Sequence, residues 1–122
     1  MPIVEISAVR QEGLDVPEVL AKLCRELAVA LGEPEDGMWA TWRPLDHYVE
    51  GTRRATRQPF DTHPPLVRVT ALEGRTPEAV RAMLECVGHV LERELRLEAG
   101  NVFVRYDEAR RGAVYTGGRV VE

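Results

Sequence analysis

The sequence predicts an α+β (α/β) fold: one domain over residues 1–122, made of two consecutive strand–helix–strand units. The segment 2–9 (PIVEISAV) repeats as 65–72 (PLVRVTAL), with three identical and four conservative positions. In each half this β-branched run precedes an apolar pattern with helical spacing and then a second apolar run. We expect a four-stranded mixed sheet with both helices on one face, and parallel strands within each unit.

The first unit covers about residues 2–50 and begins with a strand over 3–9. Asp15 is a candidate N-cap for the helix that follows, and a second strand is expected over about 38–43. The apolar face of this helix has the spacing of three and four that a helix requires. It consists of Val16, Val19, Leu20, Leu23, Leu27 and Leu31.

The second unit covers about residues 65–122 and begins with a strand over 66–72. Thr76 is a good N-cap, Pro77 suits the first helical position, and a second strand is expected over about 102–106. The glycines of the tail predict turns around a short terminal hairpin. The apolar face of this helix consists of Val80, Met83, Leu84, Val87, Leu91 and Leu95.

The segment 51–64 is rich in Arg, Pro and Thr, and we interpret it as a connecting loop. A domain boundary is not expected there, because one unit of about 60 residues barely covers its own sheet. The strands carry mostly apolar residues on both sides. We therefore expect the sheet face without helices to be covered by association with other subunits.

The composition argues against two classes of protein, nucleic-acid binders and membrane proteins. A net charge of −4 argues against a general nucleic-acid binder, which would show a basic surplus. No apolar run approaches the ~18 residues of a membrane span, and the first residues lack the pattern of a signal peptide. We therefore expect a cytoplasmic protein with neither nucleic acid nor membrane as a partner.

The chemical inventory points to the amino terminus. The two cysteines and three histidines lack the spacing of a metal site, and no glycine-rich phosphate motif is present, so we expect neither metal nor cofactor. The only serine, Ser7, lies within a strand, and the only lysine, Lys22, lies on the polar side of a helix. If an amine takes part in catalysis, the amino-terminal one is the remaining candidate.

The second half resembles 4-oxalocrotonate tautomerase, a short chain of the tautomerase superfamily. The match runs over 65–78 (PLVRVTALEGRTPE), its most specific part is the Leu-Glu-Gly-Arg segment 72–75, and the pair Gly117-Gly118 also fits. The first half matches more weakly but begins Met1-Pro2. The length resembles fused two-unit members, such as 5-carboxymethyl-2-hydroxymuconate isomerases and malonate semialdehyde decarboxylases. The resemblance implies a tautomerase-like fold and a homotrimer.

The resemblance also implies a catalytic proline. After removal of Met1, Pro2 would be a free secondary amine that acts as general base on a small enol or 2-oxo carboxylic acid, in an isomerase without a cofactor. An amino terminus titrates near ~7.7–8.0, and burial and nearby cations lower the pKa of an amine toward neutrality, where a base is most efficient. The motif makes Arg75 the residue that binds the substrate carboxylate.

The repeat itself supports this pairing. If a pseudo-twofold axis relates the two units, strands 3–9 and 66–72 are antiparallel neighbours, and Pro2 lies beside the turn 72–75. By the same symmetry Pro65 lies near 9–11, where its nitrogen is an amide and cannot act as a base. One active site per chain is expected.

Further site residues are less well specified. The arginine of the second strand in the short tautomerase falls at Phe103 here. Arg43 and Arg105 are candidates to replace it as substrate-binding residues. Tyr106 and Trp39 are candidates to cover the site, although each also suits a core or a subunit interface.

Three alternatives remain open at this point. One is a decarboxylase of a 3-oxo acid on the same scaffold, with a cationic proline. Another is a non-catalytic, trimeric binding protein that has kept the fold. The third is a different βαββαβ module, such as a dimeric α+β sheet protein.

Overall fold

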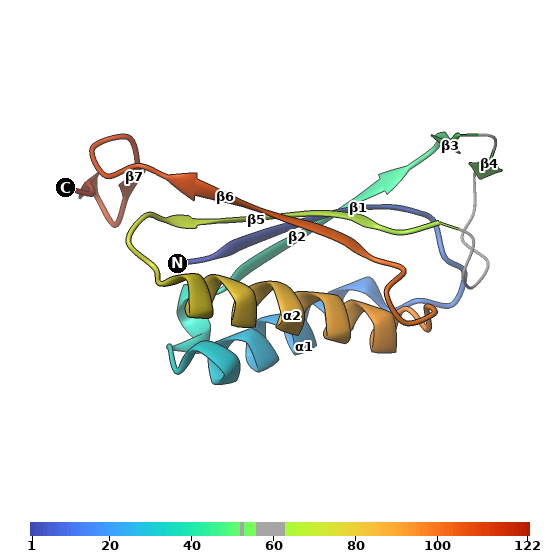
Figure 1. Ribbon diagram of the computed structural model, residues 1–122, viewed down its shortest axis with the longest axis horizontal. Helices are drawn as coiled ribbons and strands as arrows, with labels where there is room; N and C mark the ends of the chain where they lie inside the picture. The colour runs from blue at the N-terminus through green and yellow to red at the C-terminus, as the bar shows by residue number, and fades with distance from the viewer. Residues whose placement is uncertain (52, 56–62) are drawn as a thin grey trace.

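Four strands form one mixed sheet in the order β2-β1-β5-β6, and two helices lie on one of its faces (Figure 1). The computed structural model describes residues 1–51, 53–55 and 63–122. The sheet strands are β1 (Ile3–Val9), β2 (Trp39–Leu45), β5 (Leu66–Leu72) and β6 (Phe103–Ala109). The predicted fold class is therefore confirmed.

The strands pair in the same way in both halves of the repeat. β1 is parallel to β2, with Ile3 opposite Trp39, and β5 is parallel to β6, with Leu66 opposite Phe103. The two units meet through β1 and β5, which are antiparallel, with Ile3 opposite Thr70. The expected pairing of the repeated segments is thus confirmed, and the two units are related by a pseudo-twofold axis.

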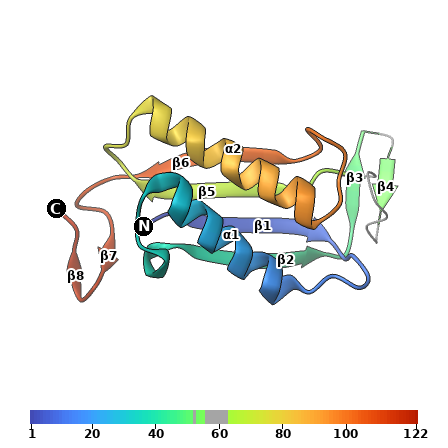
Figure 2. The same cartoon turned by 90° about the horizontal axis from the view of Figure 1, so that it is seen from below.

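Both helices begin at the expected caps. α1 (Val16–Leu31) starts after Asp15, whose side chain accepts a hydrogen bond from the Glu18 backbone N–H at 3.1 Å. α2 (Pro77–Glu94) starts after Thr76, whose hydroxyl accepts one from the Ala79 N–H at 3.1 Å. A short 3-10 helix, η1 (Glu35–Gly37), then leads into β2. The helices run antiparallel across the sheet (Figure 2).

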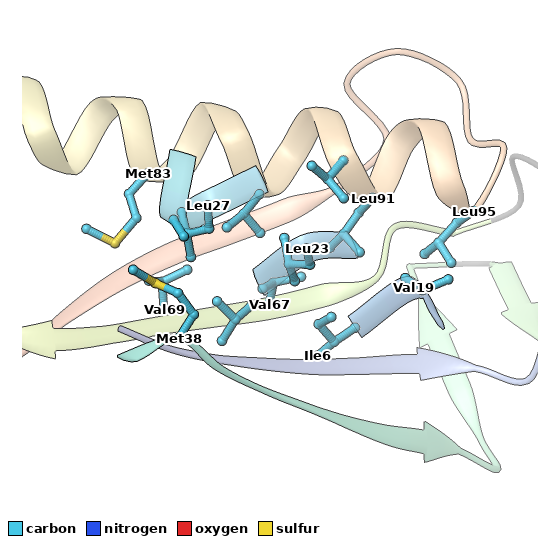
Figure 3. Close-up of a cluster of buried hydrophobic side chains, with 14 of the residues drawn as sticks. Ile6, Val19, Leu23, Leu27, Met38, Val67, Val69, Met83, Leu91 and Leu95 are labelled. Atoms are coloured by element: carbon cyan, nitrogen blue, oxygen red, sulfur yellow. The ribbon is translucent and has the colours of Figure 1, made fainter. Parts of the chain in front are cut away.

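The core lies between the helices and the sheet (Figure 3). Each helix turns its predicted apolar face inward against the even-numbered residues of β1 and the odd-numbered residues of β5. The largest fully buried side chains include Ile6, Leu23, Leu27, Val69, Met83 and Leu91.

Some boundaries differ from the predicted ones. β2 and β6 continue to Leu45 and Ala109, beyond the predicted ends at 43 and 106. Part of the expected loop 51–64 is a strand, β4 (Arg53–Ala55), which pairs with β3 (Tyr48–Glu50). Residues 52 and 56–62 of that expected loop lie outside the described residues.

The predicted terminal hairpin is present. β7 (Tyr115–Thr116) and β8 (Arg119–Val120) pair in antiparallel fashion. Gly117 and Gly118 join them with φ angles of 63° and 82°. Positive φ at both central residues is the geometry of a type I′ turn, which suits glycine.

The sheet face without helices, here called the open face, is not mostly apolar, so that expectation was wrong. Arg68 lies at the centre, 2.9 Å from Glu5 and 3.9 Å from Asp107, and Arg105 lies 3.4 Å from the same aspartate. Buried residues alternate with more exposed ones in β5, and Arg68 and its register partner Arg105 in β6 occupy positions that face away from the helices. Large apolar side chains on this face include Trp39, Leu66 and Phe103, which are 47%, 42% and 54% exposed.

Candidate active site

The start of the chain lies beside the loop between β5 and α2. Ile3 is opposite Thr70, so Pro2 stands opposite Ala71 in the same antiparallel register. Pro2 is buried, and its carbonyl oxygen accepts a hydrogen bond from the Trp39 backbone N–H at 3.1 Å. The chain therefore enters the sheet where α1 ends and α2 begins (Figure 2), next to the turn 72–75, as the symmetry argument predicted.

Arg75 occupies this junction and is held there by a residue that the sequence analysis missed. Its Nη1 lies 2.7 Å from Oε2 of Glu33, and its Nη2 lies 3.1 Å from Oε1. The side chains are 17% and 33% exposed, so the pair is partly shielded from water. Glu33 directly follows Gly32, the left-handed C-cap of α1, and its backbone N–H donates to the Ala28 carbonyl. An acidic residue after the cap glycine, at the sheet end where the chain begins, was the available signal.

These groups set the protonation of the amino terminus. Burial, followed by the positive charge of Arg75, lowers the pKa of the Met1 amino group, while Glu33 acts in the opposite direction. The hydrogen bonds from Arg75 lower the pKa of the Glu33 carboxyl, which is therefore an anion at neutral pH. An amine at this end of the sheet is thus shifted toward its neutral, basic form.

Tyr106 lies on the far side of Arg75. The two residues line a pocket of about 640 Å³ between the first turns of α2 and the edge strand β6. The Tyr106 hydroxyl is buried and has no hydrogen-bond partner in the described part of the chain. Burial, and then Glu108, raise its pKa, while Arg75 lowers it.

Pro2 does not line this pocket. β5 separates β1 from β6, and two strand spacings amount to about 10 Å. Arg75, in the loop after β5, acts electrostatically on both the amino terminus and Tyr106. Arg75 is therefore the residue whose charge affects both the amino terminus and the Tyr106 hydroxyl.

The other predicted site residues point elsewhere. Trp39 touches Pro2 through its backbone, but it shares the open face with Ile3. Arg43 and Arg105 line a hollow of about 660 Å³ on the same open face. The sheet lies between these three side chains and the helix-covered face, so a single chain does not bring them to Arg75.

The opposite end of the sheet repeats the backbone arrangement. The Phe103 N–H donates to the Pro65 carbonyl at 3.1 Å, which mirrors the bond at Pro2, and Pro65 stands opposite Ala8. Arg10, the counterpart cation, makes one 3.4 Å contact with Asp46, and both side chains are largely exposed.

Over residues 1–51, 53–55 and 63–122, no three His, Cys, Asp or Glu side chains are grouped so that they could hold a metal ion. Within the same ranges no helix has the length and apolarity to cross a membrane.

Comparisons with known proteins identify the fold. No protein-family model matches the sequence, and no curated protein matches it either. Solved structures do: a native fused 4-OT superposes with a TM-score of 0.81 at 20% identity, covering 97% of this chain and 94% of its own. The chain has the tautomerase fold.

Two further structures share the tautomerase fold with this chain. Pt0534 inactivated by 2-oxo-3-pentynoate superposes with a TM-score of 0.80 at 19% identity, covering 98% of this chain and 94% of its own. A macrophage migration inhibitory factor from Oncomelania hupensis gives 0.76 at 16% identity, with coverage of 100% and 83%. The predicted resemblance is confirmed at the level of fold.

Proposed function

We propose that this protein is a tautomerase, an isomerase without a cofactor, that acts on a small enol or 2-oxo carboxylic acid. Pro2, exposed as the amino terminus after removal of Met1, is the general base, and Arg75 binds the substrate carboxylate. The observation that carries the proposal is the position of the first residues of β1 beside Arg75, where burial and the guanidinium lower the pKa of the Met1 amine.

The reaction needs only a proton transfer. The neutral amine takes the proton from the enol oxygen, and the resulting ammonium delivers it to the carbon at the other end of the conjugated system. The substrate keeps its atoms and charge, and the amine returns to its starting state. Arg75 fixes the carboxylate through charge-assisted hydrogen bonds, and the nearby amino end of α2 adds favourable potential for an anion.

The lowered pKa favours this chemistry over decarboxylation. A cationic proline would need an amine that stays protonated at neutral pH. At the neighbouring Met1 amine, burial and Arg75 both act against protonation, and Glu33, whose effect ranks third, acts in the opposite direction. A tautomerase therefore fits the electrostatics better than a decarboxylase of a 3-oxo acid.

We also propose that the 122 residues form a single domain that assembles as a cytoplasmic homotrimer, without nucleic-acid or membrane partners. One fused 4-OT structure is described as an asymmetric trimer. The open face here exposes large apolar side chains, which fits an interface. On this proposal Arg43, Arg105 and Trp39 contact a substrate only across the subunit boundary.

An electrophilic 2-oxo acid tests the base directly. We expect protein without Met1, verified by intact mass, to gain the full mass of one 2-oxo-3-pentynoate molecule at Pro2. The amine forms a bond to the alkyne, and its proton moves to the adjacent carbon. Peptide mapping locates the adduct, and the blocked protein should lose isomerase activity toward enol and 2-oxo acids.

The control is Pro2→Ala, which keeps a terminal amine but loses the secondary, ring-held nitrogen. We expect its kcat/KM to fall by at least about tenfold while the oligomeric mass stays unchanged. A Pro2→Ala variant with full activity, or a native protein that retains Met1 and still isomerises substrate, would contradict the mechanism. Absence of turnover with every acid would favour a binding protein.

A further inference from the structure

Glu33 changes what Arg75 can bind. A guanidinium has five N–H donors, and Glu33 engages one on each of the two terminal nitrogens. Among the described residues the remaining donors, on Nε and on the outer sides of Nη1 and Nη2, have no other acceptor. Arg75 therefore keeps an edge for one incoming carboxylate, although its charge is already balanced.

The surroundings of this pair are acidic rather than basic. The pocket next to Arg75 contains one further arginine, Arg81, whose charge is balanced by Glu85 at 3.3 Å. Glu108 lines the same pocket. With Glu33 included, two arginines face three glutamates. A singly charged acid meets a site with little net charge, and a second carboxylate meets negative charge without a free cation.

We propose that Glu33 is a specificity-determining residue: by occupying the Arg75 fork, it makes the site select singly charged 2-oxo or enol acids and disfavour doubly charged ones. This inference rests on the proposed function, because it assumes that Arg75 binds substrate. The discrimination is electrostatic, since like charges brought together in a partly shielded site repel more strongly than in water.

Binding of two probe acids tests the inference without requiring turnover. 2-Oxobutanoate carries one carboxylate and 2-oxoglutarate carries two. Isothermal titration should show that the wild-type protein binds 2-oxobutanoate more tightly. Glu33→Gln keeps the size of the side chain and one acceptor oxygen, but it removes the charge and replaces the second acceptor with an NH2 donor. We expect this variant to gain about tenfold more affinity for the dianion than for the monoanion.

Glu26→Gln is the matched control. Glu26 accepts hydrogen bonds from both terminal nitrogens of Arg93 in the same two-pronged arrangement. That pair joins exposed positions of α1 and α2, away from the pocket. The control should lose a comparable ion pair and leave both affinities unchanged. Melting curves of the two variants show whether either affinity change merely reflects lost stability.

The outcomes separate the inference from the proposed function. An unchanged ratio of the two affinities in Glu33→Gln would overturn the role of Glu33. So would failure of that variant to bind either acid, because a freed Arg75 would then take no carboxylate. A shifted ratio without isomerisation of any acid would support Glu33 as the specificity residue and refute the tautomerase proposal. Isomerisation of an acid together with an unchanged ratio of the two affinities would support the tautomerase proposal and refute the role of Glu33.

Discussion

Truncation of Leu23 to alanine measures how much the helix-to-sheet core contributes to stability. Leu23 lies on α1 and is fully buried between the helices and the sheet (Figure 3). The substitution removes three carbons, which at about 0.8 kcal/mol each gives a transfer cost of about 2.4 kcal/mol. A cavity framed by two helices and a sheet closes poorly, so the total cost should reach about 3–4 kcal/mol.

Urea unfolding provides the assay, with Leu66→Ala as the matched control. The same three carbons are removed from a side chain that is 42% exposed on the open face. For Leu23→Ala we expect a lower midpoint with an unchanged slope, and a loss that is a large part of the 5–15 kcal/mol typical of whole domains. Equal losses for the two variants at every protein concentration would refute the reasoning. A Leu66→Ala loss that depends on concentration would instead reveal an interface.

The remaining predictions concern the amino terminus and the assembly. Arg75→Gln removes a charge that lowers the pKa of the terminal amine and leaves Glu33, which raises it. The amine pKa should therefore rise. Because 1-fluoro-2,4-dinitrobenzene reacts with the neutral amine, the pH at which the terminus reacts at half its maximal rate should rise as well. An unchanged or lower half-maximal pH would contradict the electrostatic account. Phe103→Arg places a cation on an exposed apolar position of the open face. Sedimentation should then show monomers with unchanged helical circular dichroism, and a persistent trimer would exclude this position from the interface.

The repeat made the central strands predictable, whereas the ends of the outer strands were not. Strands 3–9 and 66–72 have the predicted bounds because buried apolar residues alternate along almost the whole of both segments. The outer strands were predicted too short, because Pro44 and Asp107 directly follow the predicted ends and neither residue favours a strand. Their backbones nevertheless pair as far as Leu45 and Ala109, since the central partner strands continue that far. Tertiary pairing here overrides local preference.

The candidate site was predictable to the extent that topology determines it. Antiparallel pairing of the repeats places Pro2 beside the turn that contains Arg75, whichever side chains surround them. The partner of Arg75 was not predictable in this way. Glu33 reaches it because the left-handed cap at Gly32 ends α1 over the start of β1, and that geometry depends on how the helix packs.

The two ends of the sheet show which part of the site depends on side chains rather than on the fold. Backbone hydrogen bonds at Pro2 and Pro65 are equivalent, both 3.1 Å long. The cations differ: Arg75 makes two short contacts in a partly shielded pair, while Arg10 makes one 3.4 Å contact on the surface. An exposed pair is screened by water and contributes little, so the Arg10 end offers weak discrimination between anions. The two units therefore share the backbone frame, and the partly shielded ion pair of Arg75 and Glu33 distinguishes one end from the other.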